Sequence, residues 1–81
     1  MPVTERTIEL AARIRKAAKN PDLAVTVDLD GYGVKCAVHV EGREPMTYQT
    51  RRGASRRYVE GPFYDFIAED VARALKEPGN G

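Results

Sequence analysis

The residues best suited to chemistry are the arginines between positions 50 and 61, in the segment TRRGASRRYVEG. Guanidinium groups beside a serine hydroxyl and a tyrosine ring combine positive charge, hydrogen-bond donors and an aromatic plane. This combination suits the phosphates of a nucleic acid, and it equally suits an acidic protein surface. A basic segment of a small domain can also remain a solvated surface turn. The candidate partner-binding residues are Arg51, Arg52, Arg56, Arg57 and Tyr58.

Secondary candidates lie outside this segment. Three are basic residues of the first predicted helix, and the others belong to predicted turns and strands. They are Arg13, Lys16, Lys19, Tyr32, Arg43 and Gln49.

The residue types needed for catalysis are sparse. Cys36 is the only cysteine and His39 the only histidine, and their odd separation along a predicted strand places them on opposite faces of the sheet. They cannot form a nucleophile and base pair, and together they fall short of a zinc ligand set. Asp65 and Glu69 share a helix face near a helix N-terminus, where carboxylates complement the helix dipole. The sequence therefore predicts no enzyme, no metal site and no cofactor.

Composition indicates one folded domain. The chain has 81 residues, of which 42% are hydrophobic and 31% charged, which are values of a globular protein. A single cysteine cannot form an internal disulfide, and no apolar signal core or membrane-length run is visible, so we expect a cytoplasmic protein outside the membrane. The net charge of +1 conceals blocks of alternating sign, positive over 1–21 and 42–60 and negative over 22–41 and 61–81.

Hydrophobic periodicity predicts the elements that position these residues. Leu10, Ile14 and Ala17 mark one helical stripe and Phe63, Ile67, Val71 and Leu75 another, while valines alternate with polar residues between them. Asn20-Pro21 ends the first helix, with asparagine suited to the left-handed cap, and Gly61-Pro62 introduces the last. The predicted elements are a helix over 4–19, strands over 23–29, 34–41 and 46–51, and a helix over 62–77.

This order predicts an α+β domain of α-β-β-β-α type. Its arrangement is a three-stranded antiparallel meander with both helices packed on the valine-rich face. The other face is expected to be polar and exposed. An open face and an edge strand on so small a domain are compatible with either a monomer or a homodimer, formed face to face or by edge pairing.

The element order resembles that of double-stranded RNA-binding domains. The resemblance is carried by Gly53, Ser55, Arg56 and Arg57, since that family has a small-residue and basic motif at the start of its second helix. It implies duplex RNA binding through these arginines. The sequence departs from the family because Gly61-Pro62 separates these arginines from the predicted helix, which leaves Arg56 and Arg57 on a loop, and because Asp65 and Glu69 lie near the start of that helix. In addition, its Asp30-Gly31-Tyr32-Gly33 turn lacks the Gly-Pro-x-His pattern.

In size, alternating charge and lack of a catalytic set, the chain is similar to small inhibitors from phages and mobile elements, including anti-CRISPR proteins. The leading hypothesis is a non-catalytic inhibitor or accessory factor that acts by protein–protein interaction on a nucleoprotein complex. The first alternative is direct binding of double-stranded nucleic acid through the basic segment together with the basic residues of the first helix. The second alternative is a structural subunit of a larger assembly.

Overall fold

A helix, a three-stranded sheet and a second helical run follow one another along the chain, which confirms the α-β-β-β-α order. The structure is a computed structural model that describes residues 5–30, 35–51 and 53–76. Its elements are α1 (Glu5–Ala18), β1 (Val25–Leu29), β2 (Lys35–Val40), β3 (Met46–Gln49), α2 (Arg56–Tyr58), the π-helical segment η1 (Val59–Phe63) and α3 (Tyr64–Lys76).

The sheet is an antiparallel meander with the order β1-β2-β3. Val27 pairs with Val38, which in turn pairs with Met46. Valine side chains of β1 and β2 are buried, whereas the residues that alternate with them face solvent or are half-buried. The predicted strands were each slightly too long. Leu23 belongs to the turn after α1, where its N–H donates to the Asn20 carbonyl, and β3 ends at Gln49, opposite Lys35.

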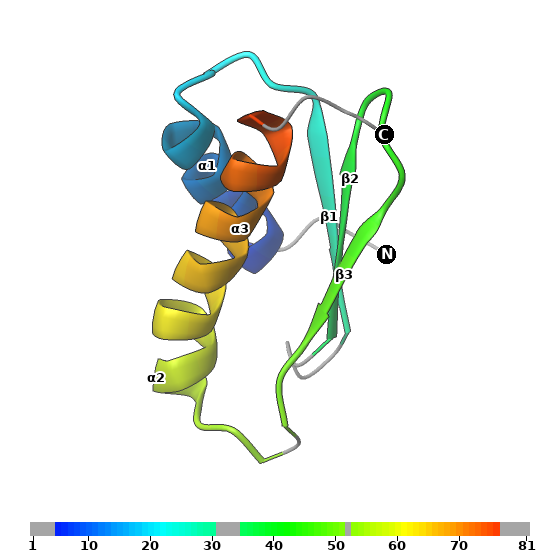
Figure 1. Cartoon of the computed structure of the whole chain (residues 1–81). Coiled ribbons are helices and arrows are strands. Elements are labelled where there is room, and N and C mark those ends of the chain that lie inside the picture. Colours follow the sequence, from blue (N-terminus) through cyan, green and yellow to red (C-terminus); the bar gives the residue numbers. More distant parts are fainter. Residues whose placement is uncertain (1–4, 31–34, 52, 77–81) are drawn as a thin grey trace.

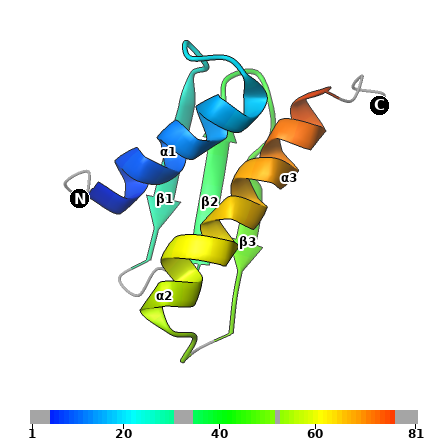
Figure 2. The same ribbon diagram turned by 90° about the vertical axis from the view of Figure 1, so that its left-hand side faces the viewer.

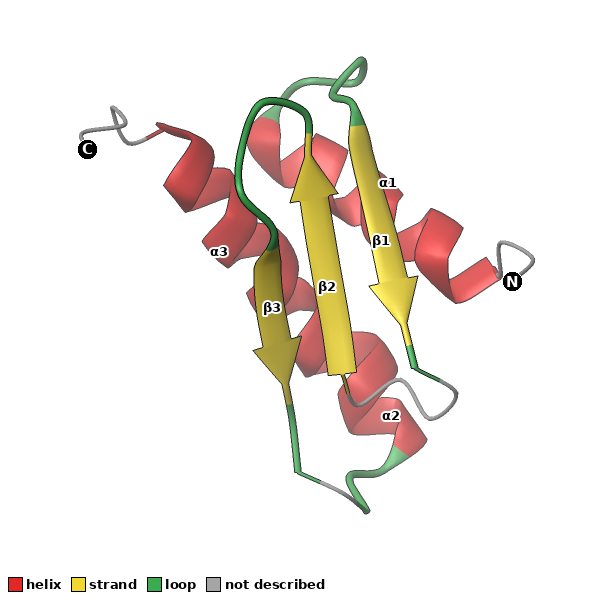
Figure 3. Cartoon of the chain, turned by 90° about the vertical axis from the view of Figure 1, so that its right-hand side faces the viewer, coloured by secondary structure: helices red, strands yellow, loops and turns green. Residues whose placement is uncertain are grey.

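Both helices cover the same face of the sheet, as Figure 1 shows in profile. Seen from the helix side in Figure 2, α1 lies over β1 and β2, and α3 crosses toward β3. The opposite face carries no helix in the described part of the chain (Figure 3). The core fills the space between the two layers. Its fully buried side chains are Leu10, Ile14, Val38, Tyr64, Ile67 and Val71.

The first helix ends one residue earlier than its sequence signal indicates. Lys19, and not Asn20, adopts the left-handed backbone conformation, with a φ of 57°. The Lys19 N–H donates to the Lys16 carbonyl and the Asn20 N–H to the Arg15 carbonyl, which is the pattern of a Schellman cap. The Asn20 side chain instead accepts a hydrogen bond from the Asp22 N–H at 3.1 Å. The Asn20 side chain therefore stabilises the turn that follows the cap.

The last helix begins much earlier than predicted. Its expected start was residue 62, but helical structure begins at Arg56 and runs through η1 into α3. Gly61 and Pro62 lie inside this run, in the π-helical segment, whose wider turn accommodates a proline that lacks an N–H. Val59 and Phe63 are buried in the core. Burial of these two side chains outweighs the helix-breaking tendency of the Gly-Pro pair.

Within the described residues, no helix is long and apolar enough to cross a membrane.

Candidate functional site

The basic segment forms a turn followed by the first turn of a helix. Gly53 has a φ of 88°, a left-handed conformation that favours glycine, and the Ala54 N–H closes the turn on the Arg51 carbonyl. Ser55 then caps the helix, because its hydroxyl accepts a hydrogen bond from the Tyr58 N–H at 3.1 Å. The expectation that Arg56 and Arg57 lie on a loop was therefore wrong. Both side chains project from α2.

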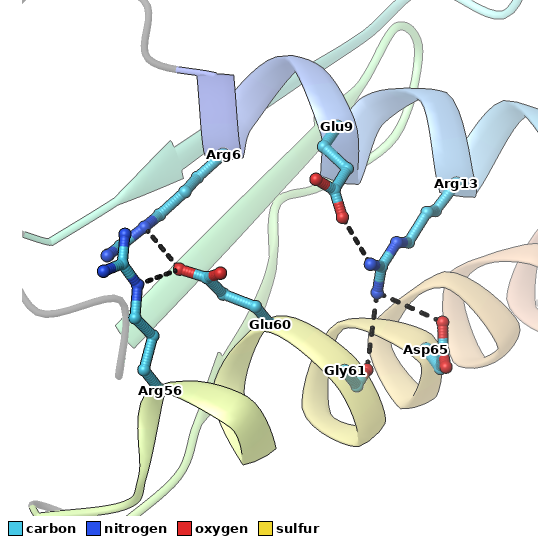
Figure 4. Close-up of polar contacts among 7 residues, drawn as sticks. All are labelled: Arg6, Glu9, Arg13, Arg56, Glu60, Gly61 and Asp65. Atoms are coloured by element: carbon cyan, nitrogen blue, oxygen red, sulfur yellow. Dashed lines mark hydrogen bonds and ion pairs between the residues drawn. The ribbon is translucent and has the colours of Figure 1, made fainter.

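Arg56 forms an intramolecular ion pair that supports the fold. Its Nε lies 2.9 Å from Oε2 of Glu60, and the same oxygen lies 3.0 Å from Nε of Arg6 on α1 (Figure 4). The hydrogen bond from Arg56, helped by the nearby Arg6 charge, lowers the pKa of the Glu60 carboxyl. One carboxylate thus joins the start of the second helical run to the start of the first.

The guanidinium of Arg13 is also engaged in intramolecular contacts. Its guanidinium binds Glu9 one turn back, Oδ1 of Asp65 at 3.2 Å and the Gly61 carbonyl at 3.4 Å (Figure 4). It also lies 5.8 Å from the centre of the Tyr64 ring, within cation–π range. Arg13 therefore cross-links α1 to η1 and α3.

Three exposed side chains contrast with the paired arginines, and we call them the arginine surface: Arg51, Arg57 and Tyr58. Neither guanidinium has an ion pair or a hydrogen bond within the part of the chain that the structure describes, and both are exposed. Tyr58 is 45% exposed, and its ring stacks on that of buried Phe63, with centroids 6.4 Å apart and an interplanar angle of 16°. The surface lies at the end of the molecule formed by α2 and the segment before it (Figures 1 and 2). Arg52 and Tyr32 lie outside the described residues.

The other basic candidates are not part of this surface. Lys16 and Lys19 are exposed at the C-terminal end of α1, which points to the opposite end of the molecule from α2 (Figure 2). Arg43 donates to the Ala74 carbonyl near the end of α3, at 3.3 Å. Gln49 is exposed on the open face at the end of β3. The structure thus divides the basic residues between two ends and the helix interface.

The side chains with catalytic potential are kept apart. Cys36 is buried, and its desolvation, together with the nearby Asp28 charge, raises the pKa of the thiol to about 12. His39 is exposed on the other face, with Nε2 3.5 Å from Oδ2 of Asp28. The predicted separation of these two residues is confirmed. Across residues 5–30, 35–51 and 53–76, no group of three or more histidine, cysteine or acidic side chains is arranged to hold a metal ion.

Two aromatic residues near β3 form a contact that the sequence reading missed. The Tyr48 side chain points toward α3, and its hydroxyl donates to Oδ2 of Asp70 at 2.7 Å. Phe66 meets the Tyr48 ring edge-on, with centroids 6.0 Å apart, yet remains 55% exposed. The available signal was the position of Phe66 outside the apolar stripe of its helix.

A shallow depression of about 430 Å³ lies where the three strands come together near the arginine end. It carries both signs of charge, and its only thiol is the un-ionised one of Cys36. The depression is lined by Asp28, Leu29, Asp30, Lys35, Cys36, Ala37, Thr47, Tyr48 and Gln49.

Comparison with known proteins gave no relative: no protein-family model, no curated protein and no solved structure matches the chain.

Proposed function

We propose that this chain is a non-catalytic binding protein that docks onto another protein through the arginine surface. The observation that carries the proposal is that the exposed guanidinium groups of Arg51 and Arg57 have no acidic partner among the described residues. The half-exposed ring of Tyr58 follows Arg57 on the same helical turn. Arginine and tyrosine are the residue types that contribute most to protein interfaces. The expected partner surface is acidic, with carboxylates that can accept paired hydrogen bonds from a guanidinium.

Rigidity of the supporting structure favours binding at this position. Arg57 and Tyr58 belong to a capped helical turn, and the Tyr58 ring already rests on buried Phe63. The ion pairs of Arg56 and Arg6 with Glu60 tie the same turn to α1. Binding therefore orders fewer groups than it would on a mobile segment, which lowers its entropic cost.

The finer form of the proposal is a small inhibitor or accessory factor that acts on a nucleoprotein complex. Guanidinium groups pair with carboxylates and with phosphates, and a nucleoprotein complex presents both. The inhibitory role rests on the alternating blocks of charge and on a sequence whose one histidine and one cysteine are predicted to form no catalytic set.

Direct duplex binding is the weaker reading, because most basic side chains are either paired or remote. Arg13 and Arg56 are held by carboxylates, and Lys16 and Lys19 lie at the other end of the molecule. Two or three phosphate contacts would supply little of the counterion release that drives affinity for nucleic acid.

A matched capture experiment tests the docking proposal. Bait proteins would be the wild type, the double variant Arg51→Ala/Arg57→Ala, the single variant Tyr58→Ala, and a control, Lys16→Ala/Lys19→Ala, that loses the same charge at the opposite end. We expect a protein partner that the wild type and the control retain and that both arginine-surface variants lose. Equal capture by all four baits would refute the assignment of the surface.

Fluorescence anisotropy with labelled duplex RNA and duplex DNA tests the competing function. We expect no binding at about 0.15 M salt, because only a few cationic side chains are available on one face. Micromolar affinity that weakens with salt and disappears in the Arg51→Ala/Arg57→Ala variant would replace protein docking with phosphate binding.

A further inference from the structure

The outer edge of β3 carries backbone hydrogen-bonding groups that have no partner among the described residues. The Asp30 N–H donates to the Lys35 carbonyl and the Glu41 N–H to the Ala24 carbonyl, so odd-numbered residues of β2 bond to β1. Even-numbered residues of β2, and their partners Met46 and Tyr48, therefore bond between β2 and β3. The N–H and C=O groups of Thr47 and Gln49 consequently point away from the sheet, along the edge seen in Figure 3.

This edge lacks the charged residues that usually protect an exposed strand. The four residues of β3, from Met46 to Gln49, are all neutral. The other edge strand, β1, carries Asp28 near its middle, which is within ion-pair distance of His39. Natural edge strands discourage pairing with other chains by charge, proline or bulges. Between its ends β3 has none of these, and Pro45 stands only before its first residue.

An exposed aromatic side chain lies beside the same edge. Phe66 projects from α3, is 55% exposed, and contacts the Tyr48 ring edge-on. Tyr48 is fixed by its hydrogen bond to Asp70, and Arg73 neutralises that carboxylate. A strand added at β3 would place its helix-side residues against this pair of rings.

We propose that a second copy of this chain pairs with β3, antiparallel and about a twofold axis at Tyr48. In this register Thr47 of one copy lies opposite Gln49 of the other, so the outward N–H and C=O groups of both residues bond across the axis. The two Tyr48 side chains become direct cross-strand neighbours on the helix side, where they are joined by Phe66 from each copy. The result is a continuous six-stranded sheet.

Charge complementarity favours a second copy of this chain, and not a strand of an unrelated protein, as the occupant of the β3 edge. Glu44 precedes β3 and Arg51 follows it, and both side chains are exposed. Antiparallel pairing about Tyr48 places Arg51 of one copy opposite Pro45 of the other, next to its Glu44. The twofold axis repeats this contact, so each end of the paired strands gains an opposite-charge pair.

This inference goes beyond the proposed docking function, and the two share Arg51. In the dimer Arg51 pairs with Glu44 of the other copy, so the part of the arginine surface left for a partner is Arg57 and Tyr58. A twofold axis across β3 places the α2 ends of the two copies at opposite ends of the dimer. Arg57 and Tyr58 project from α2, outside the strand pairing, so both copies keep them for a partner. The dimer would be bivalent.

Sedimentation velocity over a concentration series tests the pairing. The interface is small, so we expect a dissociation constant on the order of 10 to 100 μM for the wild type. The variant Thr47→Lys/Gln49→Lys sets lysines opposite each other across the axis and should weaken the dimer about tenfold or more. The variant Thr47→Lys/Gln49→Glu sets lysine opposite glutamate and should restore dimerisation to within about threefold of the wild type.

A second pair of variants separates the aromatic contact from general loss of surface hydrophobicity. Phe66→Ala should weaken the dimer about tenfold, because its ring adds to the cross-axis cluster. Ile8→Ala removes a similarly exposed apolar side chain, 60% exposed on α1, and should leave the dissociation constant unchanged. Thermal unfolding of each variant is the control for correct folding. This control is needed because Gln49 pairs with Lys35 in the sheet, so a new charge at position 49 also acts within the monomer.

Three outcomes would overturn the proposal. A wild type that stays monomeric to about 500 μM, well above the expected dissociation constant, would refute self-pairing. The occupant of the β3 edge would then be a strand of another protein. A dimer that both lysine variants leave unchanged would place the contact elsewhere, for example on the open face. Equal weakening by the lysine pair and the lysine–glutamate pair would reject the register about Tyr48.

Discussion

Two regions of this molecule use arginine in opposite ways. At the interface of α1 with η1 and α3, Arg6 and Arg13 contact Glu60 and Asp65, and these contacts hold the helices together (Figure 4). At the arginine surface, Arg51 and Arg57 contact no acidic residue in the described part of the chain. Residue type alone does not separate a structural arginine from one available for binding. The distribution of carboxylates around each guanidinium does.

The largest effect is expected from breaking the apolar layer beneath the helix interface. Ile67 is fully buried, so Ile67→Ala should lower the free energy of unfolding by about 2–5 kcal/mol through lost burial and the cavity left behind. The neighbouring change Phe66→Ala, at an exposed position, should cost less than about 1 kcal/mol, measured at a concentration where the protein is monomeric. Urea denaturation measures both. Similar losses for the two variants would contradict the assigned core.

The contrast between the two kinds of arginine can be measured directly. Arg13→Ala removes contacts with Asp65, the Gly61 carbonyl and the Tyr64 ring, and should lower the free energy of unfolding by about 1–2 kcal/mol. Arg57→Ala should change it by less than about 0.5 kcal/mol, because no intramolecular partner is lost. Urea denaturation of the two variants provides the comparison. A loss for Arg57→Ala equal to that for Arg13→Ala would remove the distinction between the regions.

Glu60 gives the interface a dependence on pH. Its pKa is lower in the folded chain than in the unfolded chain, so its stabilising contribution is present above the unfolded pKa, about 4.3. This contribution is lost as the pH falls through the lower, folded pKa. The melting temperature of Glu60→Gln should therefore fall less steeply below about pH 5 than that of the wild type. Parallel curves for the two proteins would show that Glu60 adds nothing to acid sensitivity.

The smallest expected change in the free energy of unfolding at the interface is a gain and not a loss. The Tyr64 hydroxyl is buried without a hydrogen-bond partner among the described residues. Tyr64→Phe removes this unpaired polar group and keeps the ring that packs under Arg13, so stability should stay the same or rise by up to about 1 kcal/mol. Thermal denaturation gives the sign. A loss above about 1 kcal/mol would indicate that the hydroxyl is hydrogen-bonded in solution.

Local patterns in the sequence were sufficient for the layout of the fold. The alternation of Val25 and Val27 with polar residues, and the helical spacing of Leu10 and Ile14, predict which faces are buried, and the structure buries them. These patterns succeed because side-chain direction repeats every two residues in a strand and every 3.6 in a helix. They also separated Cys36 from His39 correctly.

The start of the last helical run followed from tertiary structure. Gly61-Pro62 is a strong local signal for a helix boundary, yet Val59 and Phe63 are buried on the same side as α3. Burial of two apolar side chains is worth several kcal/mol, more than the local cost of accommodating one proline in a wider turn. A rule that considers only neighbouring residues cannot weigh that burial.

By itself, the amino-acid sequence determined the element order, the two buried helix stripes and the polar face of the sheet, because each depends on short-range periodicity. Only the tertiary structure decided which arginines are available for a partner. Arg13 meets Asp65 across 52 positions of the chain, whereas Arg57, close to Glu60 in sequence, has no carboxylate partner in the described chain. Such pairings depend on how helices distant in sequence pack together, and that packing is fixed by the shared core and not by the charges themselves.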